Sequence, residues 1–137
     1  MKNIPMTSLN DNWKTPKRFK EELDKEFIFD FDPCPEDPKF NGLEIEWGRS
    51  NFVNPPFSNI ALWVKKGFEE WKKGKTVVFL IPSRTDTRWW HDYCMKATEI
   101  RFIKGRLTFE GAKYNAPFPS AVIVFRKDSI PPKQNKI

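Results

Sequence analysis

The short segment Asn54-Pro55-Pro56-Phe57 carries the residue types best suited to chemistry in this chain. It follows the apolar pair Phe52-Val53, which indicates the end of a strand. Two consecutive prolines exclude a helix and provide no backbone N–H, so the segment offers mainly acceptors: two proline carbonyls and the Asn54 amide oxygen. Phe57 adds a flat apolar face. A planar exocyclic amine would find acceptors for both its hydrogens and a ring on which to stack.

This arrangement suits methyl transfer to an amine of the adenine N6 kind. The lone pair of such an amine is delocalised into the ring, which makes the nitrogen a poor nucleophile. Acceptors that draw its two hydrogens out of the ring plane localise the lone pair, which then attacks a sulfonium methyl group. An ordinary proline-rich turn at the end of a strand explains the same four residues, and the segment alone does not separate the two interpretations.

A second group of candidate residues, Asp32-Pro33-Cys34, follows another predicted strand. A carboxylate at a strand end accepts hydrogen bonds from the hydroxyl or amino groups of a nucleoside cofactor. The alternative is that Asp32 only caps the turn, as Asp often does. No glycine-rich phosphate loop is present, which counts against nucleoside triphosphates and dinucleotides but not against a cofactor without phosphates.

Charge favours a polyanionic partner, because the chain has 24 basic and 18 acidic residues and a formal net charge of +6. Basic residues are interleaved with aromatic ones between Lys104 and Asn115. This pattern suits nucleic acid, although a solvated hairpin has the same composition. Arg84 follows a long apolar run and is also placed to reach a polyanion. His91, the single histidine, is expected to pack or face solvent rather than act as a base.

Several classes of protein and site are not indicated. No run of about 20 apolar residues is present, and residues 1–12 lack the apolar core of a signal peptide, so we expect no membrane partner. Cys34 and Cys94 with one histidine do not make a Cys/His zinc site, and we expect no metal. Reduced cysteines and a cytoplasmic location follow as expectations.

The apolar pattern predicts helices alternating with strands. Helices are expected from a Thr15 cap with Pro16 at the first position to about Glu26, from a Ser58 or Asn59 cap to Gly74, and over 86–97. Strands are expected over 27–31, 51–53, 77–81, 99–103 and 121–125, with 107–109 as a further candidate. Residues 35–50 are expected to form a loop.

This order predicts an α/β fold with a mostly parallel sheet and an antiparallel element near the C-terminus. Ligands of such sheets bind beyond the carboxyl ends of the strands, so Asp32 and Asn54 should share one edge. The 137 residues suffice for one domain, which we expect over 13–126, between a flexible N-terminus (1–12) and a flexible tail (127–137).

Taken together, the ordered motifs of this sequence resemble the phage-type (Dam-like) DNA N6-adenine methyltransferases carried by prophages. The resemblance spans roughly Asn12 to Arg126. The motifs that carry it are Trp13-Lys14-Thr15-Pro16, Phe31-Asp32-Pro33-Cys34, Asn54-Pro55-Pro56-Phe57, Ile81-Pro82-Ser83-Arg84-Thr85-Asp86-Thr87, Trp89-Trp90-His91, Gly105-Arg106-Leu107-Thr108-Phe109 and Ala116-Pro117-Phe118-Pro119-Ser120. The Asn-Pro-Pro-Phe segment is the most specific single motif, and the ordered set is more specific than any member.

The resemblance implies a compact Rossmann-like fold that binds S-adenosylmethionine and methylates adenine N6 in double-stranded DNA of a bacterial host. The base would leave the duplex by flipping, because acceptors cannot reach a paired amine. The residues implied to hold the base are Asn54, Pro55, Pro56 and Phe57, and those implied for the cofactor are Trp13, Thr15, Pro16, Asp32, Pro33 and Cys34. From their charge and position, Arg84, Arg106 and Lys113 are expected to contact the DNA.

Alternatives to this interpretation are open at the level of the sequence. Only about twenty residues separate Asp32 from Asn54, which is short for the units that usually bring a ribose-binding acid, and Glu44 or Glu46 would then serve instead. Methylation of cytosine N4, RNA adenine or a protein glutamine amide uses the same acceptors. A non-catalytic DNA-binding relative would have lost the cofactor site.

Overall fold

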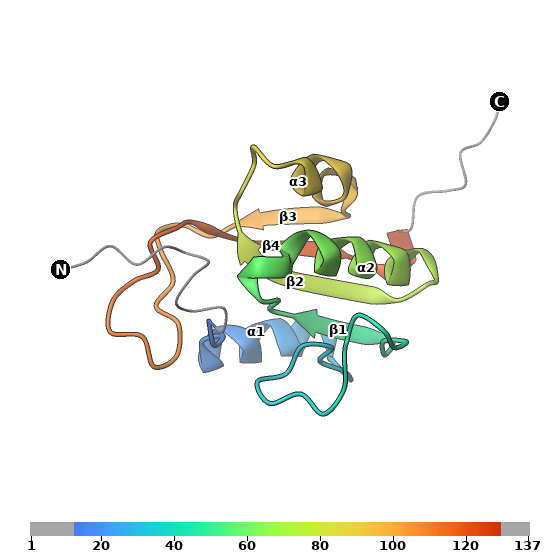
Figure 1. Cartoon of the computed structure of the whole chain (residues 1–137), viewed down its shortest axis with the longest axis horizontal. Coiled ribbons are helices and arrows are strands. Elements are labelled where there is room, and N and C mark those ends of the chain that lie inside the picture. The colour runs from blue at the N-terminus through green and yellow to red at the C-terminus, as the bar shows by residue number, and fades with distance from the viewer. Residues whose placement is uncertain (1–12, 130–137) are drawn as a thin grey trace.

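A four-stranded sheet with helices on both faces forms the centre of the molecule, and the computed structural model describes residues 13–129 (Figure 1). The helices and strands are α1 (Lys17–Phe27), β1 (Ser50–Val53), α2 (Ile60–Lys72), β2 (Thr76–Pro82), α3 (Arg88–Asp92), β3 (Glu99–Phe102) and β4 (Ser120–Phe125). Short 3-10 turns are η1 (Phe57–Asn59), η2 (Cys94–Lys96) and η3 (Lys127–Ser129). The expected α/β class is confirmed.

The strand order is β1-β2-β4-β3, in which β1 and β2 are parallel and β4 is antiparallel to both of its neighbours. The expectation of a mostly parallel sheet is therefore wrong, whereas the antiparallel C-terminal strand is confirmed. The cause is the insertion of β4 between β2 and β3, which separates two strands that run in the same direction. The Rossmann-like methyltransferase fold stays a prediction.

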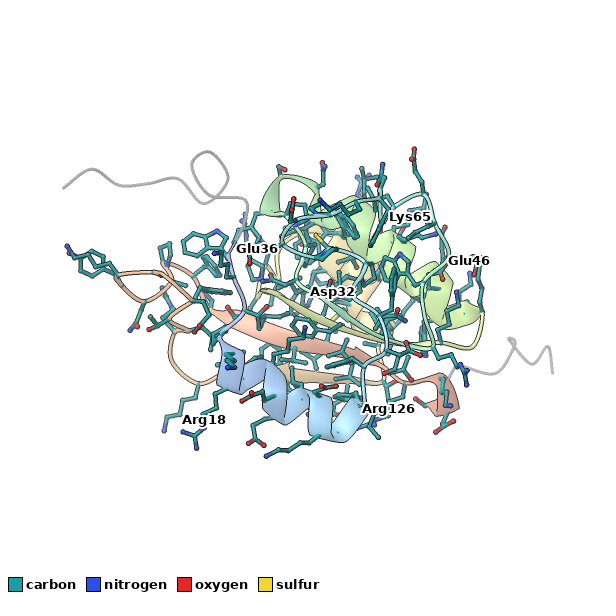
Figure 2. All side chains as sticks on the ribbon, turned by 90° about the horizontal axis from the view of Figure 1, so that it is seen from below. Arg18, Asp32, Glu36, Glu46, Lys65 and Arg126 are labelled. Carbon is teal, nitrogen blue, oxygen red and sulfur yellow. The ribbon has the colours of Figure 1, made fainter. Side chains whose placement is uncertain are left out.

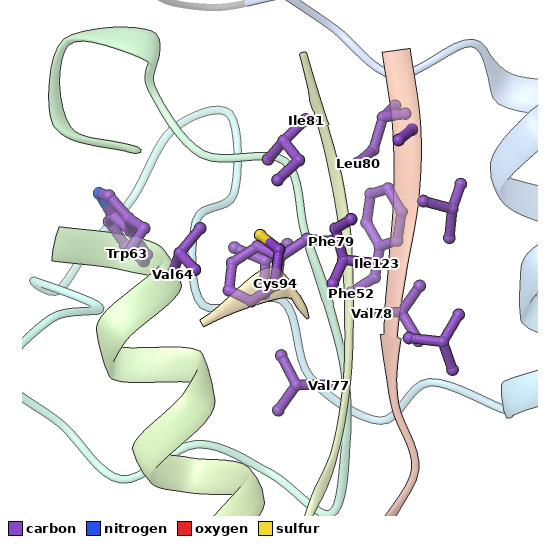
Figure 3. Close-up of a cluster of buried hydrophobic side chains, with 14 of the residues drawn as sticks. Phe52, Trp63, Val64, Val77, Val78, Phe79, Leu80, Ile81, Cys94 and Ile123 are labelled. Atoms are coloured by element: carbon purple, nitrogen blue, oxygen red, sulfur yellow. The ribbon is translucent and has the colours of Figure 1, made fainter. Parts of the chain in front are cut away.

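Side chains of β2 alternate between the two faces of the sheet and form the core with α1 on one face and α2 on the other. Val77 and Phe79 face α2 at Gly67, where an added Cβ would lie only 2.4 Å from the Phe79 ring. Val78 points to the other face (Figure 3). Phe52 of β1 is paired with Val78 and lies on that same face, under Lys20 of α1. The two helices therefore cover opposite faces of the sheet.

The strand expected over 27–31 is wrong. Helix α1 continues to Phe27, because Leu23 and Phe27 form its buried stripe at a spacing of four residues. The helix ends where Ile28 takes a left-handed conformation with φ 50°. Phe31 alone remains in the sheet, through a single parallel bridge to Asn51 of β1.

Two other expected elements also differ. Residues 107–109 form no strand but belong to a loop over 103–119, which joins β3 to β4 and is the extended orange segment in Figure 1. Glu110 N donates to Lys14 O at 2.9 Å, so this loop is attached to the segment before α1. The helix expected over 86–97 is split into α3 and η2, because Tyr93 departs from helical geometry at φ −123°.

The cap of α1 differs from the one expected, whereas the cap of α2 falls at Asn59, one of the two residues expected. Pro16, not Thr15, occupies the cap position of α1, and Thr15 instead bonds Asn54. Asn59 occupies the cap position of α2 without a side-chain cap hydrogen bond. Lys127 N, in the segment expected to be a tail, donates to Thr76 Oγ1 at 3.1 Å. The expectations for residues 1–12 and 130–137 lie outside the described residues.

Candidate active site

A pocket of about 580 Å³ lies beyond the carboxyl end of β1. Three segments surround it: the arm (residues 13–16), the loop that follows Phe31, and the tip of the 103–119 loop. The lining residues are Trp13, Lys14, Thr15, Lys20, Asp32, Cys34, Pro35, Glu36, Phe52, Asn54, Glu110 and Gly111. Figure 2 shows Asp32 and Glu36 on the loop that passes above α1. The volume is in the range of small-molecule sites, and Asp32 and Asn54 share this pocket.

The Asn54 side chain is held in one orientation by the arm. Its Nδ2 group donates to the carbonyl of Trp13 and, at 3.0 Å, to Thr15 Oγ1. An amide carries two N–H donors and one oxygen acceptor, so these two bonds use both donors. The Oδ1 atom is the acceptor that remains, on a residue that lines the pocket.

The two prolines differ in what they offer. The Pro56 carbonyl accepts a hydrogen bond from Asn59 N at 3.2 Å within the η1 turn. Pro55 is buried, and its carbonyl adjoins Asn54 in the chain. The Pro55 carbonyl is therefore the better candidate for a second acceptor beside Asn54 Oδ1.

The Phe57 ring is buried inside an aromatic cluster, with 6% of the residue exposed. Trp13 stacks on it with ring centroids 5.9 Å apart and an interplanar angle of 20°. Phe118 meets it edge-on at 5.1 Å. Phe57 does not line the 580 Å³ pocket, so the structure does not bring its ring face together with Asn54 in that space.

Asp32 caps its own turn and keeps a second carboxylate oxygen for other partners. Its Oδ1 accepts from Cys34 N at 2.9 Å, and this bond caps the turn. Burial raises the pKa of Asp32, while the Cys34 N–H and the charge of Lys20 act in the opposite direction. Burial and the neighbouring Asp32 charge raise the pKa of the Cys34 thiol to about 11, so this thiol is neutral at pH 7.

The acids proposed as substitutes for a ribose ligand are placed elsewhere. Neither Glu44 nor Glu46 lines the pocket, and Glu46 instead bonds Lys73 at 2.7 Å and Lys75 at 2.6 Å. Glu36 and Glu110 line it in their place. Glu110 comes from the 103–119 loop, more than fifty residues along the chain from Asn54, and no local pattern in the sequence signals it.

A smaller pocket of about 190 Å³ lies at the Phe57 turn and the start of α2. It is lined by Phe57, Ser58, Ile60, Ala61, Arg84, Thr87 and Trp89. Of the residues expected to contact DNA, Arg84 lines this pocket. Arg106 and Lys113 lie exposed on the 103–119 loop, where Lys113 Nζ sits 6.0 Å from the centre of the Tyr114 ring. Pro16 and Pro33, expected at the cofactor, line neither pocket.

The part of the chain that the structure describes has neither a metal-binding cluster nor a membrane-spanning helix. Residues 13–129 contain no cluster of three or more His, Cys, Asp or Glu side chains suited to a metal ion. None of the helices in that range is long and apolar enough to cross a bilayer. Cys34 and Cys94 are both free cysteines.

Comparison with known proteins gives two matches. The family model described as DNA N-6-adenine-methyltransferase (Dam) matches residues 3–135. A curated protein of Escherichia phage T1, named DNA N-6-adenine-methyltransferase, is 28% identical over 122 residues, which cover 78% of this chain and 51% of that protein. The chain thus spans about half the length of this relative. No solved structure matches the chain.

Proposed function

The chain belongs to the family of DNA N-6-adenine-methyltransferases (Dam), and from this premise we propose that it transfers a methyl group from S-adenosylmethionine to adenine N6 in double-stranded DNA. The observation that carries the proposal is the 580 Å³ pocket, where Asn54 lies beside Trp13, Thr15, Asp32 and Cys34. The phage relative supports action in the cytoplasm of a bacterial host, with a gene carried by a phage or prophage.

The cofactor would occupy the part of the pocket nearest Asp32. The Asp32 oxygen not used by the turn accepts from a hydroxyl or amino group, and Glu110 supplies a further acceptor. Glu36 is paired with Lys14 Nζ at 3.0 Å through its Oε1 atom. S-adenosylmethionine, when bound, supplies a methyl group on a positively charged sulfur. Pro33 contributes by fixing the backbone of the turn that carries Asp32 and Cys34.

Asn54 and Pro55 would activate the amine. Asn54 Oδ1 and the Pro55 carbonyl accept its two hydrogens, which localises the nitrogen lone pair toward the methyl group. The amine becomes positively charged as it gains the methyl group, and its extra proton leaves to water. No dedicated base is assigned, since the one histidine, His91, is bonded to Thr85 O at 2.7 Å and lines neither pocket.

The base must leave the duplex to reach these acceptors, because a paired amine inside the stack is out of reach. Stacking on Phe57 would return about 1–3 kcal/mol of the cost of extrusion. Arg84, Arg106 and Lys113 would contact the DNA backbone or base edges around the extruded nucleotide. Among the described residues, these three lie outside the 580 Å³ pocket, as groups that position a duplex should.

The test is incubation of the protein with tritiated S-adenosylmethionine and DNA of mixed sequence, followed by digestion and nucleoside analysis. We expect label in N6-methyladenine, and none with the Asn54→Ala variant. Label in N4-methylcytosine, or only with RNA or protein added, would replace this function with one of its chemical rivals. Calorimetry separates a non-catalytic DNA-binding protein, which would bind DNA but give no heat with S-adenosylmethionine.

A further inference from the structure

The indole of Trp13 covers the ring that is proposed to stack on the target base. The two rings are nearly parallel at 20°, with centroids 5.9 Å apart, and Phe57 is 6% exposed. An indole is a fused five- and six-membered aromatic ring system, as is a purine. The pair therefore has the form of a bicyclic base stacked on phenylalanine.

Trp13 also engages the polar group of the same segment. Its carbonyl accepts from Asn54 Nδ2, so one residue contacts both the amide and the aromatic ring proposed to hold a base. Its indole Nε1 is buried and has no hydrogen-bond partner among residues 13–129. An unpartnered buried donor is unfavourable, so moving the indole to a place where Nε1 meets water or an acceptor offsets part of the cost of leaving Phe57.

Trp13 and Phe57 stack on each other but line different pockets. Trp13 and Asn54 line the 580 Å³ pocket, whereas Phe57 lines only the 190 Å³ pocket. No single pocket is lined by both Asn54 and Phe57, and the indole occupies a stacking position on Phe57. The indole must move for both contacts to form.

We propose that Trp13 fills the target-base position in the free protein and is displaced when an unpaired purine enters. The inference rests on the proposed function and specifies a conformational step within it. Trp13 also meets Phe109 and Phe118 edge-on, each at 5.4 Å between ring centroids. Both belong to the 103–119 loop that carries Arg106 and Lys113, so displacement of the indole is coupled to the loop expected to contact DNA.

The experiment is ¹⁹F NMR of the whole chain with its six tryptophans replaced by 5-fluorotryptophan. Single-stranded oligo(dA) is the probe, because its adenines are unpaired and no target sequence is needed; oligo(dT) of equal length controls for backbone contacts. The Trp13→Phe variant identifies the Trp13 resonance by its loss. We expect saturating oligo(dA), but not oligo(dT), to shift this resonance, while the resonance of fully buried Trp71 stays in place.

The possible outcomes separate this inference from the function on which it rests. Oligo(dA) binding with an unmoved Trp13 resonance overturns the inference and leaves the proposed function intact. Absence of oligo(dA) binding, together with absence of N6-methyladenine in the tritium assay, overturns both. A shift produced equally by oligo(dT) overturns purine displacement in favour of a general response to nucleic acid.

Variants at Trp13 give a second readout. A folded Trp13→Ala variant should bind oligo(dA) at least about threefold more tightly than the wild type, because no indole has to be displaced. Leu62→Ala, on the exposed face of α2, is the matched control and should leave the affinity unchanged. Unchanged or weaker oligo(dA) binding by Trp13→Ala, with reduced S-adenosylmethionine affinity, would overturn the inference and assign Trp13 to the cofactor alone.

Discussion

Asn54 and Thr15, 39 residues apart in the chain, are joined by a hydrogen bond of 3.0 Å from Nδ2 to Oγ1. With the bond to the Trp13 carbonyl, this contact uses both N–H donors of the Asn54 amide within residues 13–129 and leaves Oδ1 as its acceptor. The arm and the end of β1 therefore form one structural unit. Residues expected at the cofactor thus also orient the residue expected at the base.

Asn54→Ala should abolish methyl transfer while leaving S-adenosylmethionine affinity within a few-fold of the wild type. The substitution removes an acceptor that acts on the amine in the transition state, so its effect falls mainly on the chemical step. Single-turnover kinetics with calorimetry of cofactor binding measures the two effects separately. Turnover near that of the wild type would show that the base is held elsewhere.

Thr15→Val should lower the turnover number by a smaller factor, because Thr15 acts through Asn54. Loss of one neutral hydrogen bond is worth about 0.5–1.5 kcal/mol, or roughly a two- to tenfold change. Thr15→Ser retains the hydroxyl and should restore most of the activity. Unchanged turnover in Thr15→Val with a loss in Thr15→Ser would mean that the Thr15 methyl group, and not its hydroxyl, is what matters.

Asp32→Ala should weaken S-adenosylmethionine binding by about 1.5–3 kcal/mol, the worth of a hydrogen bond to a charged group. Asp32→Asn removes the charge but keeps an acceptor for Cys34 N. Comparing it with Asp32→Ala therefore distinguishes the effect of losing the charge from the effect of losing the hydrogen bond that caps the turn. Burial raises the pKa of Asp32. As the pH is lowered, the affinity of the wild type for S-adenosylmethionine should therefore begin to fall at a higher pH than it would with an ordinary aspartate. Unchanged affinity in both folded variants would leave Asp32 with the turn-capping role alone.

Glu70 should make folding stability depend on pH. Its fully buried carboxylate accepts from Trp47 N at 3.0 Å and pairs with Lys66, Lys73 and Lys75. Burial alone would raise its pKa, but these partners bring it from 4.5 down to about 2. The stabilisation is complete above pH 4.5 and is lost as the pH falls toward 2, an effect on the order of 3 kcal/mol.

Urea unfolding at pH 7 and pH 3 tests this stabilisation, with Glu70→Gln expected to reduce the pH dependence. Glu26→Gln is the matched control, since Arg101 and Arg126 also lower the pKa of Glu26 to about 2. The Glu26 side chain is 37% exposed, and solvent screening should limit its contribution to below about 1 kcal/mol. Equal effects of the two substitutions would contradict the assigned role of burial.

Arg84→Ala and Arg106→Ala should each weaken DNA binding, and sequence selectivity is predicted to reside in the segment from Lys104 to Asn115. A lost phosphate contact lowers the affinity equally for all DNA sequences and reduces the slope of log affinity against log salt concentration by about one. A lost guanine contact instead relaxes the preference for the target sequence. Methylome sequencing of cells expressing each variant, with DNA titrations at several salt concentrations, distinguishes the two. Lys65→Ala, at an exposed position of α2, controls for the loss of one positive charge. Unchanged motif, affinity and salt dependence in both variants would place recognition in the loop from Pro35 to Ser50.

The sequence alone determined the elements whose signals are local. The apolar spacing from Ile60 to Trp71 predicted α2, and the continuous apolar runs predicted β2 and β4, because burial against neighbours leaves a periodic pattern along the chain. The Asn54 segment was likewise recognisable, since its pattern lies within four consecutive residues. The family was identified from motifs in their order along the chain.

Only the tertiary structure decided which distant residues meet. The insertion of β4 between β2 and β3 depends on hydrogen bonds between strands, which no spacing within a strand specifies. The same holds for Glu110, brought to the pocket by a backbone bond to Lys14 O, and for Trp13, whose indole covers Phe57. Contacts between segments far apart in the chain depend on how their surfaces fit together, and a single sequence records the two surfaces without the pairing between them.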